Sequence, residues 1–217
     1  KAKGKFISFL DVDDYWDPNK LFLQVPKFKN KKIGLVYSNF YKYYNNEKKK
    51  IAYTSKLPNG RVTSSIIQNY QIGFLTVMIR RSFIKNKKKI FDYEYDLLSD
   101  YDFILNFSLD YDFAGLNQPL AFYRIHSNQL QKKKFVLQAK QFCKWVNKKK
   151  IKKKFKNYDL SEIKKKYNYY SLIKELENSK IKLILDIFKN FNFIHFIKIS
   201  AFLLLPRKLV FKFIDNV

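Results

Sequence analysis

The carboxylates of Asp11, Asp13 and Asp14 are the side chains near the start of the chain that could do chemistry. They follow the apolar run at residues 6–10, which predicts a buried strand. They precede Asp17, a predicted helix N-cap followed by proline. In open α/β sheets, ligands bind beyond the carboxyl ends of strands. Divalent cations prefer oxygen ligands and often bridge a carboxylate to a substrate phosphate. The acidic segment therefore predicts a clamp for a metal ion and a diphosphate.

The whole segment at residues 4–21 resembles the metal-binding signature of the family 2 glycosyltransferases, which have the GT-A fold. In that family a strand ends in Asp-x-Asp-Asp, and an aromatic pair, a proline and a Lys-Leu follow. Those positions are here Asp11-Val12-Asp13-Asp14, Tyr15-Trp16, Pro18 and Lys20-Leu21. The alternative interpretation is a strand end with solvated acids and a capped helix.

The resemblance implies a chemistry for each carboxylate of this segment. Asp11 and Asp13 would hold Mn²⁺ or Mg²⁺ together with the diphosphate of a nucleotide-sugar donor, and Asp14 would support the loop. The sugar would pass to a hydroxyl acceptor with inversion of the anomeric centre. The metal would neutralise charge that grows on the departing diphosphate.

A second acidic segment at residues 98–107 also follows the family pattern. In the family, a Phe-Asp leads to a Glu-Asp pair whose second acid is the general base. By position Asp100 matches this base and Asp102 a later acid, although Ser99 stands where the glutamate is usual. A sugar hydroxyl is a poor nucleophile, so a carboxylate must take its proton during attack. The alternative is a capping box, with Ser99 as N-cap and Asp102 at the third helical position.

Residues 120–128 resemble the family's closing motif, Tyr-Arg-x-His-x-x-Asn. There His126 would complete a metal shell or contact a phosphate, and Arg124 would pair with phosphate oxygens of the donor. A structural histidine at a strand end is the alternative. The resemblance extends over residues 4–128.

The predicted fold class is α/β, a partial GT-A (Rossmann-like) mixed sheet with helices over residues 1–130. Alternation predicts a strand at 33–44, and an apolar, β-branched run predicts one at 74–79. Residues 113–124 are predicted to form one or two strands and residues 100–109 a helix. Residues 131–217 are predicted to form an α-helical basic tail. Family 2 enzymes begin with a nucleotide-binding βαβ half, so the resemblance implies that this half is missing and that the fragment alone is inactive.

The formal net charge is +26, from 44 Lys+Arg against 18 Asp+Glu. Such a balance suggests nucleic acid or an anionic membrane surface as partner, but AT-rich codons produce the same composition. The apolar run at 193–205 is shorter than the roughly 20 residues of a bilayer span. It predicts either an interfacial helix on an anionic leaflet or a tail packed on the catalytic domain. A single cysteine, Cys143, excludes an intrachain disulfide.

The favoured function is a glycosyltransferase of bacterial cell-surface polysaccharide synthesis, acting on a glycan or lipid-linked acceptor. It would be cytoplasmic and peripheral on the inner face of the cell membrane. A nucleic-acid-binding or membrane-surface module without catalysis is the alternative. Nucleic acid is disfavoured as a partner, because carboxylates at residues 11–14 would repel phosphate without a metal. A glycoside hydrolase, which needs two carboxylates and no metal, is a third hypothesis.

Overall fold

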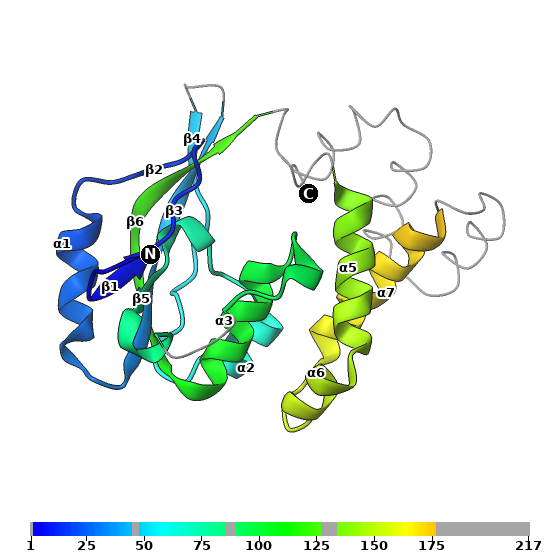
Figure 1. The fold of residues 1–217 in the computed structure, drawn as a ribbon. Helices are drawn as coiled ribbons and strands as arrows, with labels where there is room; N and C mark the ends of the chain where they lie inside the picture. Colours follow the sequence, from blue (N-terminus) through cyan, green and yellow to red (C-terminus); the bar gives the residue numbers. More distant parts are fainter. Residues whose placement is uncertain (1, 45–47, 86–89, 127–133, 177–217) are drawn as a thin grey trace.

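The computed structural model describes residues 2–44, 48–85, 90–126 and 134–176. These residues form a mixed β-sheet with helices on both faces, and a helical region packs beyond it (Figure 1). The strands are β1 (Phe6–Ser8), β2 (Tyr15–Trp16), β3 (Ile33–Tyr44), β4 (Lys48–Ile51), β5 (Met78–Arg80) and β6 (Asp112–Ile125). The α-helices are α1 (Lys20–Gln24), α2 (Thr63–Gln68), α3 (Ser99–Asp110), α5 (Phe135–Asn147), α6 (Lys149–Lys154) and α7 (Ser161–Leu176). Short 3-10 helices are Val25–Lys29, Phe74–Thr76, Arg81–Phe83 and Tyr93–Tyr95.

The sheet has the strand order β1-β5-β3-β6-β2, with β4 paired to β3 as a hairpin. Strands β3 and β6 run parallel, and the other pairs are antiparallel. Residues 34–40 of β3 are buried without interruption. A continuous buried run is typical of a strand whose two faces are both covered. The buried polar side chains in this segment, Ser38 and Asn39, form hydrogen bonds.

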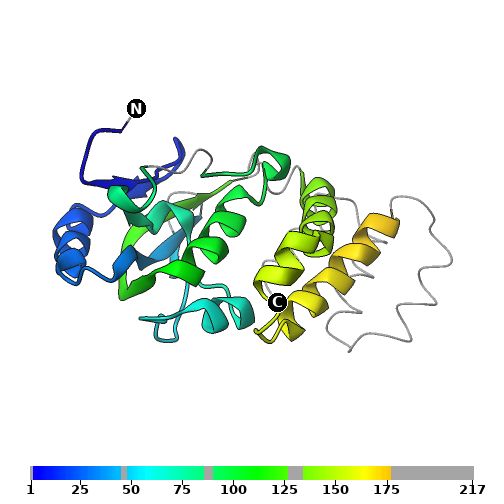
Figure 2. The same cartoon turned by 60° about the horizontal axis from the view of Figure 1, so that its bottom comes forward.

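Each face of the sheet has its own core. On one face, Phe28 beyond α1 packs with Val36 and Met78. On the other face, α2 and α3 cover the sheet, and α5 to α7 follow as a separate stack (Figure 2). The large core cluster on this side includes Leu35 of β3 and Trp145 of α5. The hydrophobic core therefore continues from the sheet into the helical region, and the division predicted at residue 130 stays a prediction.

The predicted fold class, a mixed α/β sheet followed by helices, is confirmed, and the strand predicted at 33–44 has those bounds. The strand predicted at 74–79 is wrong in its first half. Residues Phe74–Thr76 form a 3-10 helix, and the strand is Met78–Arg80. The Thr76 hydroxyl donates to the Gly73 carbonyl at 2.7 Å, which stabilises this turn instead of an extended chain.

The N-cap predicted at Asp17 and the alternative capping box at Ser99 are both absent from the structure. Helix α1 begins at Lys20 with Asn19 at the N-cap, and the Asp17 carboxylate instead accepts the Asn19 N–H at 2.9 Å. Helix α3 begins at Ser99, and its N-cap, Leu98, makes no side-chain cap. The capping box considered as the alternative for Ser99 and Asp102 does not form.

The apolar run at 193–205 lies outside the described residues. Within the described ranges, no helix has the length and apolar character needed to cross a membrane.

Candidate active site

The acidic turn, residues 11–14, connects β1 to β2 at the end of the sheet. The Asp14 N–H donates to the Asp11 carbonyl at 3.2 Å. The Asp14 carboxylate points inward, where its Oδ1 accepts the Arg124 N–H at 2.9 Å. Asp14 is 7% exposed. This hydrogen bond joins the acidic turn to the end of β6.

Asp14 retains unsatisfied hydrogen-bonding capacity. Among the described residues its buried Oδ2 has no hydrogen-bond partner. The pKa of the Asp14 carboxyl is raised to about 6, mainly by burial and also by the nearby charges of Asp13 and Asp11, while the hydrogen bond from Arg124 acts the other way. The turn therefore concentrates negative charge that a cation would stabilise.

Asp13 and His126, two of the predicted metal ligands, lie within hydrogen-bond distance of each other. His126 Nε2 lies 2.9 Å from Asp13 Oδ2, and the two side chains are 41% and 42% exposed. The Arg124 side chain donates from Nε to the Asp13 carbonyl. The hydrogen bond from His126 lowers the pKa of Asp13 below its usual value. The closing motif therefore returns to the acidic turn, as the resemblance implies.

These donors fit a divalent cation. Mg²⁺ is commonly held by one or two carboxylates, with substrate phosphates and water filling the other positions. Asp13 supplies such a carboxylate, and the His126 nitrogen beside it would have to give up its hydrogen bond to Asp13 to become a ligand. Over the ranges that the structure describes, Asp11 does not join them in a group of three metal-binding side chains. Asp11 instead faces the adjoining cavity.

The acidic cavity, about 500 Å³, is lined by Asp11, Asp14 and Asp100, among other residues. It lies between the acidic turn, the start of α3 and α7, which come from distant parts of the sequence. Its walls are rich in aromatic rings: Phe40, Tyr53, Tyr70, Phe74, Tyr101 and Tyr123. An aromatic cavity with a few convergent polar groups is typical of a small-molecule site.

Asp100, the predicted base, lies in the first turn of α3 and faces the acidic cavity. Its Oδ1 accepts the Tyr101 N–H at 2.7 Å. Burial raises the pKa of Asp100, and the charge of Asp11 adds to this, while Lys166 acts in the opposite direction. A carboxylate with a raised pKa is a stronger proton acceptor, which suits a general base.

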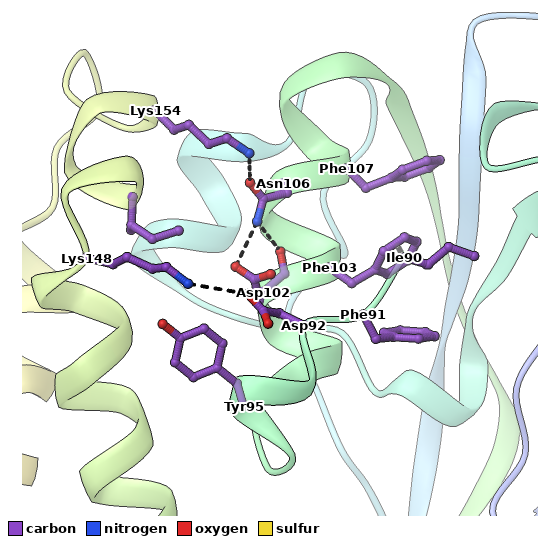
Figure 3. Close-up of a pocket in the computed structure, with 11 residues that line it drawn as sticks. Ile90, Phe91, Asp92, Tyr95, Asp102, Phe103, Asn106, Phe107, Lys148 and Lys154 are labelled. Carbon is purple, nitrogen blue, oxygen red and sulfur yellow. Dashed lines mark hydrogen bonds and ion pairs between the residues drawn. The ribbon is translucent and has the colours of Figure 1, made fainter. Parts of the chain in front are cut away.

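Asp102 has a different environment, although it is two residues further along α3. The Trp145 Nε1–H and the Asn106 side-chain amide both donate to its Oδ1 at 2.8 Å. Asp102 lines the helix-interface pocket, a separate cavity of about 320 Å³ between α3 and the α5–α6 segment. Figure 3 shows the hydrogen bond between Asp102 and Asn106. Lys154 donates to Asn106 from the facing helix, and Lys148 lies nearby. Asp102 is therefore a structural link between α3 and α5.

Two residues of the opening motif also prove structural. Trp16 Nε1 donates to the Leu75 carbonyl at 2.8 Å, and the Lys20 ammonium lies 4.4 Å from the Trp16 ring centroid. Lys20 is fully buried and donates to Gln24 at 2.7 Å. Burial lowers the pKa of Lys20 to about 8. These contacts hold α1 against the sheet and fix the end of the acidic turn.

Lys166 and Tyr70 line the acidic cavity but were not predicted as site residues. The Tyr70 hydroxyl is buried, with no hydrogen-bond partner among the described residues. Lys166 comes from α7, within a lysine-rich stretch where nothing in the sequence separates it from its neighbours. Tyr70 ends the 62–70 segment, whose pattern indicates only a short helix.

The geometry and the sequence motifs agree with the comparison to known families. Residues 1–95 match the family described as "Glycosyl transferase family 2". These residues belong to a family 2 glycosyltransferase domain, and the resemblance seen in residues 4–21 is confirmed.

Two curated proteins of Escherichia coli are similar to this chain. One is the UDP-Glc:alpha-D-GlcNAc-diphosphoundecaprenol beta-1,3-glucosyltransferase WfgD, 29% identical over 62% of this chain and 51% of the relative. The other, WfaP, has the same described activity and is also 29% identical, over 62% of this chain and 51% of its own length. The chain spans about half the length of these curated relatives.

A solved structure, that of S. aureus TarS 1-349 in complex with UDP, is also similar, and the match covers 89% of this chain and 52% of the TarS chain. The two share 14% sequence identity at a TM-score of 0.44.

Proposed function

We propose that the protein carrying this sequence is an inverting glycosyltransferase that moves a sugar from a nucleotide-diphosphate donor to a hydroxyl acceptor. The proposal depends most on one observation, the convergence of Asp11, Asp14 and Asp100 on a single cavity. Membership of residues 1–95 in glycosyl transferase family 2 supports the reaction class.

Asp100 is the proposed general base. It would take the proton of the acceptor hydroxyl as that oxygen attacks the anomeric carbon and the bond to the donor diphosphate breaks. Its burial at the cavity wall and its raised pKa support this role. General-base catalysis by a positioned side chain contributes about 10²- to 10⁴-fold to the rate.

Asp13 and His126 are the proposed ligands of Mn²⁺ or Mg²⁺, with Asp11 completing the predicted set. The bound cation would supply charge neutralisation at the leaving diphosphate. Arg124, whose side chain already contacts the Asp13 carbonyl, would orient the acidic turn and face the donor phosphates. Asp14 would hold this turn against β6 through its hydrogen bond to Arg124 N.

The proposed donor is a UDP-sugar, and the proposed acceptor is a sugar linked through a diphosphate to a lipid. Both come from the described activity of the two E. coli relatives, and the aromatic walls of the cavity are suited to sugar rings. A lipid-linked acceptor would place the reaction at a membrane surface, in the synthesis of a bacterial polysaccharide.

The test is a transfer assay with the complete protein that carries this sequence. UDP-glucose, Mn²⁺ and a short-chain α-GlcNAc-diphosphate lipid are the substrates, and the product linkage is assigned by NMR. Asp13→Ala should abolish transfer and weaken Mn²⁺ binding measured by titration, while circular dichroism stays unchanged. Asp96→Ala is the matched control, because Asp96 is exposed and lies outside the acidic cavity. Full turnover by Asp13→Ala would refute the assignment.

A further inference from the structure

Lys166 brings a positive charge from the helical region to the wall of the acidic cavity. It belongs to α7 (Ser161–Leu176) and lines the same cavity as Asp11, Asp14 and Asp100. Asp100 and Lys166 affect each other's titration, so the ammonium lies within electrostatic reach of the proposed base. The cavity wall thus carries two lysines, Lys166 and Lys42, among its carboxylates, and Lys166 lies near Asp100.

The Lys166 ammonium lies among aromatic rings. Its Nζ lies 5.0 Å from the ring centroid of Phe142, 5.4 Å from that of Tyr101 and 5.6 Å from that of Tyr170. Rings at these distances attract a cation through their negative faces. Although the residue as a whole is exposed, desolvation lowers the pKa of its ammonium. The rings therefore fix the direction of the side chain and partly remove its water.

Lys166 lacks the ion pair that neighbouring lysines form. Lys165 pairs with Glu162 at 2.6 Å, and Lys148 pairs with Glu94 at 2.7 Å. Within the part of the chain that the structure describes, Lys166 forms no ion pair. A desolvated ammonium at a cavity wall, with no carboxylate bonded to it, retains three N–H donors for an anionic ligand.

Phosphate is the anion that the proposed reaction brings to this cavity. The donor diphosphate belongs at the Asp13–His126 end, whose donors fit a cation. Asp100, the proposed base, must face the acceptor hydroxyl, and Lys166 lies on the Asp100 side. With the donor diphosphate at the other end, a phosphate group near Lys166 would belong to the acceptor.

We propose that Lys166 binds the diphosphate of the lipid-linked acceptor, so that α7 forms part of the acceptor site. This inference rests on the proposed function. Lys166 is a binding residue here, which holds the acceptor while Asp100 takes the proton from its hydroxyl. The helical region therefore contributes to substrate selection.

The experiment compares two probes in equilibrium binding to the complete protein, without donor. One is an alkyl α-GlcNAc diphosphate and the other is the alkyl α-GlcNAc glycoside, which lacks phosphate. The wild type should prefer the diphosphate. Lys166→Gln should weaken diphosphate binding by about 10- to 100-fold and leave the phosphate-free probe unchanged, and Lys166→Arg should restore part of the preference. Lys164→Gln is the charge-matched control, because Lys164 is exposed on the same helix and lines none of the cavities described here.

Several outcomes would overturn the inference while the proposed function stands. A wild type that transfers sugar but binds both probes equally would do so. So would a Lys166→Gln variant that keeps the preference, or one whose KM rises for the UDP-sugar and not for the acceptor, since this would assign Lys166 to the donor phosphates. Loss of all transfer by the wild type, with the diphosphate preference intact, would instead contradict the proposed reaction.

Discussion

Asp100 and Asp102 lie two residues apart on α3, yet their surroundings assign them opposite roles. Asp102 faces the helix-interface pocket, and Trp145 and Asn106 both donate to its Oδ1. Asp100 faces the acidic cavity, where its Oδ1 accepts the Tyr101 N–H. Asp102 is therefore held by packing contacts, and Asp100 keeps the capacity to accept a proton. The comparison teaches that the hydrogen bonds around a carboxylate, more than its position in the sequence, distinguish a packing role from the catalytic role proposed for Asp100.

The sharpest way to break this comparison is to make the same substitution at both positions. Asp100→Asn should lower kcat by about 10²- to 10⁴-fold, because the amide cannot accept the acceptor proton. Asp102→Asn should leave kcat close to wild type, since both donors bond to a single oxygen that asparagine also has. Initial rates of sugar transfer by the two complete proteins are the measurement. Equal losses in the two variants would contradict the assignment of separate roles.

Asp14 in the acidic turn is another carboxylate whose surroundings change its behaviour, and a pH series tests this. The folded-state pKa of Asp14 is raised from 3.8 to about 6, so between these values the native state binds more protons than the unfolded state. Stability contributed by this group is present at low pH and is lost as pH rises through about 6. We therefore expect the free energy of unfolding of the wild type to fall by about 3 kcal/mol at most between pH 4 and pH 7, and Asp14→Asn to remove this fall.

Denaturant unfolding of wild type and Asp14→Asn, measured at several pH values, gives this difference directly. Asparagine retains an oxygen that can accept the Arg124 N–H, so the turn itself should persist. A difference between the two proteins that does not change with pH would show that Asp14 titrates normally.

The smallest expected effect concerns the structural acid. Asp102→Ala leaves the fully buried Trp145 with no partner for its indole N–H. We expect the free energy of unfolding to fall by about 1–3 kcal/mol, measured by urea denaturation. Activity per folded molecule should remain. A variant as stable as wild type would mean that the bond from Trp145 contributes nothing to the docking of α5.

The sequence alone predicted the parts of the site that lie within one local pattern. The acidic turn follows a strand and precedes an aromatic pair, and residues 33–44 alternate and are rich in Val, Tyr and Phe. Caps were predicted less well, because Asp17 and Ser99 satisfy the pattern of an N-cap while neighbouring residues take the position. Side-chain competition of this kind is decided by geometry that a residue pattern does not contain.

Contacts between distant segments could not be predicted from residue types. The Asp14 carboxylate accepts from Arg124, and Trp145 donates to Asp102. The closing motif indicated that Arg124 and His126 lie near the donor site, but it did not identify their partners. No sequence pattern indicated Lys166 as a site residue. It differs from other lysines only in its surroundings, the aromatic rings around its ammonium and the cavity that it faces.

The parallel pairing of β3 with β6 has a consequence for synthesis of the protein. Ile33 lies opposite Asp112 and Tyr44 opposite Ile125, so a ribosome must release most of the sheet's sequence before its central pair can close. Closing such a long loop costs chain entropy before any contact is gained, and folding dominated by distant pairs is slow. Until then, the apolar β3 exposes one unpaired edge, which is a template for aggregation. Slower translation or a lower growth temperature should therefore raise the yield of soluble protein.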